Sequence, residues 1–173
     1  HAPVRPRYII PDYGKFMREG SAFLQLPPPK DIFEALNSLL IFYKHVPSVT
    51  NFPVYLGALD ELLEPFMDDV DEATAKKLIR LFLIHVDRTV LDSFSHANIG
   101  PKTTRAGRLI LEAEAELEQA VPNLTLKYQE GVTPDDFALE AVNTALHSAK
   151  PSFANHAMFK SELGENYVIA RCC

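Results

Sequence analysis

The residues of this chain best suited to chemistry are its two cysteines, which are adjacent at positions 172 and 173. The α-carbons of neighbouring residues lie about 3.8 Å apart, whereas relaxed disulfides need roughly 4.4–6.8 Å, so Cys172 and Cys173 are not expected to form a structural cross-link. A thiol can act as a nucleophile and can also take part in one-electron steps. The alternative is a tail with incidental cysteines. The preceding β-type run, residues 167–170, favours chemistry because a strand end fixes where the thiols project.

A second group of polar residues lies in a helix predicted over residues 71–98. Here His85, Thr89, Asp92 and His96 are spaced by four, three and four residues, so they would share one helix face. Histidine and aspartate on one face could ligate a metal ion. The interpretation we favour is a solvent-exposed helix face, and a metal-dependent enzyme is the alternative.

A third group is cationic. Lys102, Arg105 and Arg108 follow Gly100-Pro101 at a predicted helix N-terminus, where free N–H groups attract phosphate or carboxylate. Charged runs on helices are more often solvated faces, so an anion site is the less favoured interpretation.

The turn Lys150-Pro-Ser-Phe-Ala-Asn155 carries hydrogen-bond donors and acceptors between two predicted strands, residues 124–128 and 167–170. Strand, helix and strand in this order are typical of a βαβ unit. Loops at the carboxyl ends of parallel strands collect functional groups, and the cysteine pair follows the second strand at that same end. This coincidence strengthens the prediction that the cysteines are catalytic.

Apolar periodicity, capping residues and turn signals predict a helix-rich α/β protein that positions these groups. The predicted helices cover residues 12–19, 31–45, 58–68, 71–98, 102–121 and 133–149, with a short helix after Phe153. The predicted strands cover residues 53–56, 124–128 and 167–170, and residues 46–52 are predicted as a loop. Pro65 weakens the end of the third helix, because an interior proline removes a hydrogen bond.

Composition and charge narrow the classes of function. The chain has 173 residues and a formal net charge of −6, which argues against binding to nucleic acid or to an anionic membrane. The apolar runs are too short to cross a bilayer. Two cysteines without a disulfide framework indicate a reducing compartment, so we expect a soluble, cytoplasmic protein. Because the chain begins at His1 and stops within a predicted strand, we expect it to be a segment of a longer polypeptide.

Four motifs occur in order over residues 122–173. They are Pro122-Asn-Leu-Thr125 opening a strand, Thr133-Pro-Asp-Asp-Phe137 opening a helix, Lys150-Pro-Ser-Phe-x-Asn155, and Asn166-Tyr-Val-Ile-Ala170 running into the cysteines. This series resembles the glycyl radical enzymes of the pyruvate formate-lyase and anaerobic ribonucleotide reductase superfamily. Pyruvate formate-lyase has the same order of elements and ends it with a Cys-Cys pair. Taken whole, the chain is most similar to the YjjI-like branch.

The resemblance implies a fold and a domain organisation. The expected fold is helix-rich α/β, a fragment of a ten-stranded α/β barrel whose axis holds a finger loop with the catalytic cysteine. The chain would be one incomplete domain. Residues 1–121 would form its mainly helical part, and residues 122–173 a βαβ segment leading to the finger loop.

The resemblance also implies the chemistry of an oxygen-sensitive enzyme of anaerobic metabolism. A glycine outside this segment would store a radical that an iron–sulfur, S-adenosylmethionine-dependent activase installs. That radical would take a hydrogen atom from a cysteine, and the resulting thiyl would act on a small organic substrate. The segment itself would bind no cofactor. Its expected partners are the substrate and the activase, without nucleic acid or membrane. A homodimer is one assembly that this resemblance allows.

The resemblance assigns roles to individual residues. An ungapped match places Arg171 where pyruvate formate-lyase has its acyl-bearing cysteine and leaves Cys172 as the thiyl residue, whereas a one-residue gap restores both cysteine roles. We expect Cys172 to carry the thiyl, with Cys173 as the second candidate. Ser152, Asn155 and Arg171 are the expected substrate-binding residues.

The alternative function is a non-catalytic helical interaction domain with an exposed Cys-Cys tail. Such a domain should be monodisperse in isolation, and its cysteines should be dispensable. A barrel fragment should instead expose unpaired strand edges and aggregate. Size-exclusion chromatography of the isolated segment would distinguish the two.

Overall fold

A four-stranded parallel sheet organises the protein, and the computed structural model describes residues 8–50, 52–89 and 95–170. The strands lie side by side in chain order: β1 (Tyr55–Ala58), β2 (His96–Ile99), β3 (Asn123–Tyr128) and β4 (Ser152–Asn155). Each connection contains at least one helix, as parallel strands require. The predicted helix-rich α/β fold is therefore confirmed, with its sheet fully parallel.

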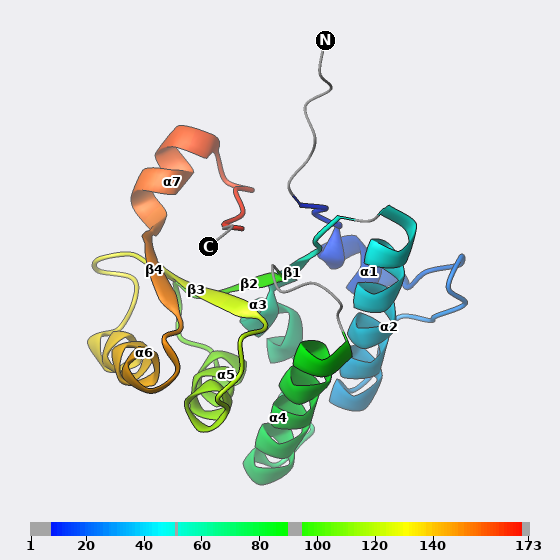
Figure 1. The fold of residues 1–173 in the computed structure, drawn as a ribbon, viewed down its shortest axis with the longest axis horizontal. Coiled ribbons are helices and arrows are strands. Elements are labelled where there is room, and N and C mark those ends of the chain that lie inside the picture. The colour runs from blue at the N-terminus through cyan, green and yellow to red at the C-terminus, as the bar shows by residue number, and fades with distance from the viewer. Residues whose placement is uncertain (1–7, 51, 90–94, 171–173) are drawn as a thin grey trace.

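The helices lie mostly on one side of this sheet. They are α1 (Tyr13–Glu19), α2 (Ile32–Thr50), α3 (Leu59–Leu63), the 3-10 turn η1 (Glu64–Phe66), α4 (Glu72–Thr89), α5 (Arg105–Glu116), α6 (Asp135–Ser148) and α7 (His156–Leu163). Figure 1 shows α4, α5 and α6 below the sheet, and α7 with the last described residues above it. No described helix is both long and apolar enough to cross a membrane.

The two faces of the sheet differ in chemistry because side chains alternate along each strand. One face carries buried apolar residues such as Ile99 and Leu126, which belong to the main hydrophobic core beneath the helices. The other face, called the polar face below, carries residues that pair across the strands: Tyr55, His96, Asn98, Thr125, Lys127 and Ser152. The main core therefore lies on the helix side, and the polar face carries a small second hydrophobic cluster, which includes Ala154 and Ile169.

Local capping signals account for several predicted helices. The side chain of Asp12 accepts a hydrogen bond from the Lys15 N–H at 2.9 Å, and α1 ends at Gly20, where φ is +71°. The side chain of Asp31 accepts one from the Glu34 N–H at the start of α2. Pro65 falls in η1, where the α-helix gives way to a 3-10 turn. Caps and helix breakers are therefore reliable guides to these boundaries.

The predicted helix over residues 71–98 is wrong in its second half. Helix α4 ends at Thr89, and β2 begins at His96. The sequence has no glycine or proline between Thr89 and Gly100, so nothing local signalled the break. Two further predictions are wrong: α2 continues to Thr50 through the predicted loop, and residues 167–170 are not assigned as a strand. A strand–helix–strand unit is present as β3–α6–β4, but its second strand lies in residues 152–155, which were predicted as part of a turn, and not in residues 167–170.

A buried ion pair ties helix α5 to the amino end of the sheet. The Lys150 ammonium lies 2.7 Å from Glu114 Oε2 and donates to the Pro122 carbonyl at 3.1 Å. Both side chains are almost fully inaccessible, with 8% of Lys150 and 0% of Glu114 exposed. Burial raises the pKa of Glu114, and the nearby Lys150 opposes that rise.

Candidate active site on the polar face of the sheet

A chain of hydrogen bonds crosses the polar face of three neighbouring strands. The Thr125 hydroxyl lies 2.8 Å from His96 Nε2 and 2.8 Å from the Ser152 hydroxyl. His96 and Thr125 are buried. Buried polar groups are costly unless they are paired, so this chain satisfies side chains that a hydrophobic core would exclude. It also fixes the side chains of β2, β3 and β4 relative to one another.

The last described residues of the chain lie on this polar face. Residues 167–170, called the docked segment below, are held by the side chain of Asn98. Asn98 Nδ2 donates to the Ile169 carbonyl at 2.8 Å, and Asn98 Oδ1 accepts from the Ile169 N–H at 3.1 Å. The Tyr55 hydroxyl also donates to Asn98 Oδ1, at 3.0 Å. The chain leading to the cysteine pair is therefore anchored through its backbone.

An aromatic cluster holds the start of the docked segment. The Tyr167 hydroxyl lies 2.5 Å from His156 Nδ1, and the Tyr167 ring stacks on Phe159 with centroids 5.7 Å apart. The Lys127 ammonium lies 4.9 Å from the Tyr167 ring centroid, a cation–π geometry. Together these contacts bury Tyr167 between β3 and α7.

Burial lowers the pKa of two basic groups in this cluster, Lys127 and His156. Burial lowers the pKa of Lys127, and the carboxylates of Glu61 and Asp60 oppose this shift. Burial also lowers the pKa of His156, and Lys127 adds to that effect by repelling a second positive charge. A neutral His156 imidazole can accept the hydrogen of the Tyr167 hydroxyl.

Asp60 lies just beyond the carboxyl end of β1 and is buried completely. Its Oδ2 accepts hydrogen bonds from the Gly100 N–H at 2.9 Å and from the Thr104 hydroxyl at 3.3 Å. Its Oδ1 has no hydrogen-bond partner among the described residues. Burial raises the pKa of Asp60 to about 7. This carboxyl therefore joins the ends of β1 and β2 while remaining partly protonated near neutral pH.

The predicted substrate-binding residues are not brought together on one face. Ser152 lies on the polar face, beside Thr125. Asn155 stands three residues further along β4, so it falls on the opposite face, and its Oδ1 caps α7 by accepting from the Met158 N–H at 3.0 Å. Arg171, Cys172 and Cys173 lie outside the described residues.

The shared helix face on which the metal hypothesis for residues 71–98 rested does not exist, because α4 ends at Thr89. His85 is on α4, whereas His96 is buried on β2, and Asp92 lies outside the described residues. Within the part of the chain that the structure describes, no group of three His, Cys, Asp or Glu side chains could hold a metal ion. Sequence reasoning missed Asn98 and assigned His96 to a helix, because it did not recognise the short strand β2.

The predicted anion site is occupied by carboxylates of the protein itself. Arg108 forms ion pairs with Asp136 at 2.5 Å and Glu140 at 2.7 Å. Arg105 donates to the Met67 carbonyl at 2.9 Å. These side chains tie α5 to its neighbours, so the solvated-face interpretation of the cationic stripe was closer to the structure.

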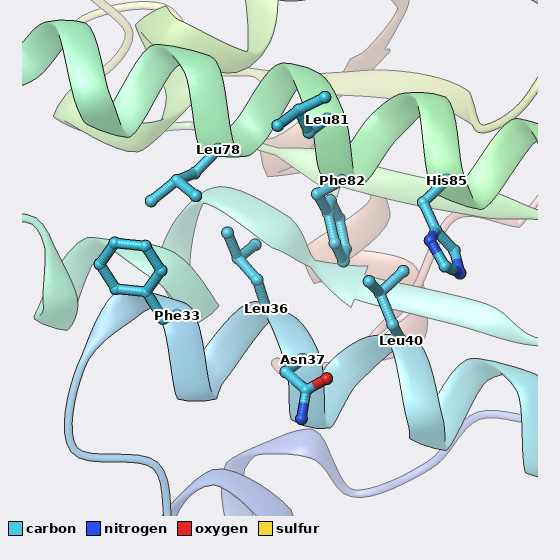
Figure 2. Close-up of a pocket in the computed structure, with 8 residues that line it drawn as sticks. All are labelled: Phe33, Leu36, Asn37, Leu40, Leu78, Leu81, Phe82 and His85. Carbon is cyan, nitrogen blue, oxygen red and sulfur yellow. The ribbon is translucent and has the colours of Figure 1, made fainter.

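A separate apolar groove lies between α2 and α4 and is shown in Figure 2. Leu36 and Leu40 of α2 face Leu78 and Phe82 of α4 across it, and His85 lies at one end. Phe33 and Leu81 on its rim are about half exposed. The groove has only two polar side chains among its described lining residues, Asn37 and His85, in contrast to the polar face.

Comparison with known proteins gives a consistent result. The family model described as "Glycyl radical enzyme YjjI-like" matches residues 1–173. An uncharacterized protein of Haemophilus influenzae is 54% identical over 172 residues, which are 99% of this chain and 33% of that protein. The "Uncharacterized protein YjjI" of Escherichia coli K12 is 47% identical over 155 residues, which are 90% of this chain and 30% of that protein. The chain thus spans about a third of the length of these curated relatives.

Proposed function

The chain belongs to the YjjI-like glycyl radical enzyme family, and on this premise we propose that it is the thiyl-bearing segment of an oxygen-sensitive enzyme acting on a small organic substrate. The stored glycyl radical supplies a one-electron oxidant for a thiol. The thiol of Cys172, with Cys173 as the second candidate, gives up its hydrogen atom and becomes a thiyl. The thiyl then abstracts a hydrogen atom from the substrate, which regenerates the thiol and leaves the unpaired electron on the substrate. A radical activase of the S-adenosylmethionine type is the expected partner, in the cytoplasm.

One observation carries this proposal: the docked segment is anchored on the polar face only a few residues before the cysteine pair. Ile169 is buried and held at both its N–H and its carbonyl by Asn98. A thiyl must be kept in a fixed place, away from water and close to its reaction partners. An anchored backbone immediately before Cys172 meets the first of these requirements.

We also propose that the sheet is part of the ten-stranded barrel of the family, with the polar face turned toward its interior. The edge strand β4 supports this. Phe153 is 43% exposed there, and a groove beside it is lined by Tyr128, Val142 and Ala154. Exposed edges with apolar neighbours are normally covered by another strand or helix. The division into residues 1–121 and 122–173 remains a proposal of the same kind.

Substrate contacts belong to the same proposal. Ser152 is on the polar face and is partly exposed, so its hydroxyl is available to a ligand on that side. Arg171 stands directly before the cysteines in the sequence. Asn155 lies on the other face of β4 and its Oδ1 caps α7, so its proposed contact with a substrate is through Nδ2, at the carboxyl end of the strand. The proposed substrate is a small organic molecule.

The test uses the full-length protein, treated anaerobically with its activase in D₂O and followed by electron paramagnetic resonance. A glycyl radical gives a doublet because its remaining α-hydrogen couples to the unpaired electron. If a thiyl cysteine exchanges hydrogen with that glycine, deuterium from the thiol replaces the α-hydrogen and the doublet collapses. We expect collapse in the wild type and in Cys173→Ala, and a persistent doublet in Cys172→Ala.

The remaining outcomes contradict the proposal in distinct ways. A doublet that persists only in Cys173→Ala would move the thiyl to Cys173. Collapse in the double alanine variant would show that neither cysteine is involved. The same result would favour the alternative of a helical interaction domain, for which the α2–α4 groove in Figure 2 is the supporting observation.

A further inference from the structure

We propose that Asn98 is a positioning residue: its side-chain amide clamps the backbone of Ile169 and thereby sets the location of the cysteine pair. The first part of this inference, the clamp, stands on the geometry alone. The second part, its effect on the cysteines, rests on the proposed function. No sequence motif marks Asn98, which is separated from Ile169 by 71 positions along the chain.

The Asn98 side chain bonds the backbone of Ile169 in the way that the backbone of a neighbouring strand would. A backbone position in a sheet offers one acceptor and one donor, and the Asn98 amide presents Oδ1 and Nδ2 to the Ile169 N–H and carbonyl in the same way. This explains how residues 167–170 stay on the sheet although they are not assigned as a strand. It also explains why both backbone groups of the buried Ile169 are satisfied.

Only an amide side chain can make all three of the hydrogen bonds seen at Asn98. Asn98 Oδ1 faces two donors, the Ile169 N–H and the Tyr55 hydroxyl, and Nδ2 faces an acceptor. Aspartate lacks the donor, leucine lacks both groups, and alanine leaves both Ile169 groups unpaired. The hydrogen-bonding partners therefore fix one orientation of the amide.

Tyr55 holds the clamp in place. Its ring is buried, and burial raises the pKa of its hydroxyl, so the hydroxyl remains a donor to Asn98. Its own backbone carbonyl accepts a hydrogen bond from the Tyr13 hydroxyl at 2.5 Å. A line of contacts thus runs from α1 through β1 to the docked segment.

The cysteines follow the clamp closely in the sequence. Cys172 is three residues beyond Ile169, and three residues of fully extended chain span at most about 11 Å. The hydrogen bonds that join His96, Thr125 and Ser152 to one another do not involve Asn98. Losing the clamp should therefore release Ile169 and the residues after it, while the sheet and the aromatic contacts of Tyr167 stay in place.

The experiment is hydrogen–deuterium exchange of the full-length protein, with the peptide covering residues 165–173 as the readout. Asn98→Ala should accelerate amide exchange in this peptide at least tenfold and leave peptides from β3 and α5 unchanged. Tyr55→Phe, which removes one hydrogen bond and little volume, should accelerate it by a smaller factor. The matched control is Thr144→Val, which removes a buried hydroxyl bonded to the Leu111 carbonyl on the helix side of the sheet.

Three results would contradict the clamp. The first is unchanged exchange of residues 165–173 in both Asn98→Ala and Tyr55→Phe. The second is that Thr144→Val accelerates exchange of this peptide as much as the clamp variants do, and the third is that Tyr55→Phe accelerates exchange over the whole protein. Because Tyr55→Phe is a mild substitution, it decides the question even if Asn98→Ala does not fold.

The positioning role has its own readout. In D₂O, activated Asn98→Ala should form the glycyl radical in the wild-type amount, and its doublet should collapse at least tenfold more slowly. Collapse at the wild-type rate, with the docked segment released, would show that the clamp does not position the cysteine. Absence of collapse in the wild type would instead contradict the proposed function and leave the clamp standing.

Discussion

Replacing Lys150 by methionine probes the buried ion pair that joins α5 to the amino end of the sheet. The substitution keeps most of the side-chain volume but removes the ammonium that lies 2.7 Å from Glu114 and bonds the Pro122 carbonyl. Glu114 has no exposed surface, and its Oε1 has no hydrogen-bond partner among the described residues. The variant therefore buries a carboxyl group with no counter-charge.

The expected loss is large. Removing one partner of a buried pair typically costs about 3–5 kcal/mol, because the remaining charge must stay desolvated or take up a proton. The pKa of Glu114 is already raised by burial and held back by Lys150, so without Lys150 it should rise further. The variant should consequently lose most of its stability at high pH and recover part of it in mild acid, where Glu114 is neutral.

The assay is urea unfolding of the full-length protein, with two further variants. Lys150→Met combined with Glu114→Leu should recover most of the lost stability, because an apolar pair can replace a buried ion pair at little cost. Lys76→Met is the matched control, since Lys76 pairs with Glu112 and Glu116 at 2.9 Å on the surface and should lose less than about 1 kcal/mol. A Lys150→Met loss no greater than that of Lys76→Met would refute the reasoning.

Two other substitutions test buried polar groups by unfolding measurements. The folded-state pKa of Asp60 is raised from 3.8 to about 7, so the native state binds the proton more tightly than the unfolded state does. The free energy of unfolding should therefore fall as the pH rises between these two values. At about 1.4 kcal/mol per pKa unit, the total fall is about 4 kcal/mol. Asp60→Asn should remove this part of the pH dependence, and an unchanged slope between pH 4 and 8 would contradict the assignment. Tyr43→Phe removes a 2.6 Å hydrogen bond from a fully buried hydroxyl to the Leu56 carbonyl and should cost about 1–3 kcal/mol. A loss below about 0.5 kcal/mol would contradict a stabilising role for this bond.

Local signals in the sequence were enough for much of the fold. Asp12 and Gly20 bound α1 as predicted, and the alternation in residues 124–128 corresponds to β3. The short strands were harder. β2 and β4 have four residues each, which is too few for alternation to stand out from a helical pattern. The missed strand β2 concealed the placement of His96 and Asn98 on the polar face.

The candidate site was predicted only in part, for a related reason. The role of the cysteine pair stays a prediction, because both cysteines lie outside the described residues, and the segment before the pair was predicted as a strand that the structure does not assign. The clamp joins Asn98 to Ile169 through a contact that no local pattern encodes. Ser152 and Asn155 were expected to act together, but their separation by three positions on β4 places them on opposite faces.

The central claim is that the docked segment carries the radical cysteine inside a barrel. The most direct measurement is an experimental structure of the full-length protein, determined without oxygen. The account predicts that the polar face lines the barrel interior and that the sulfur of Cys172 or Cys173 is in van der Waals contact with a glycine from the remaining polypeptide. A polar face open to solvent, with both cysteines on the outer surface, would contradict it.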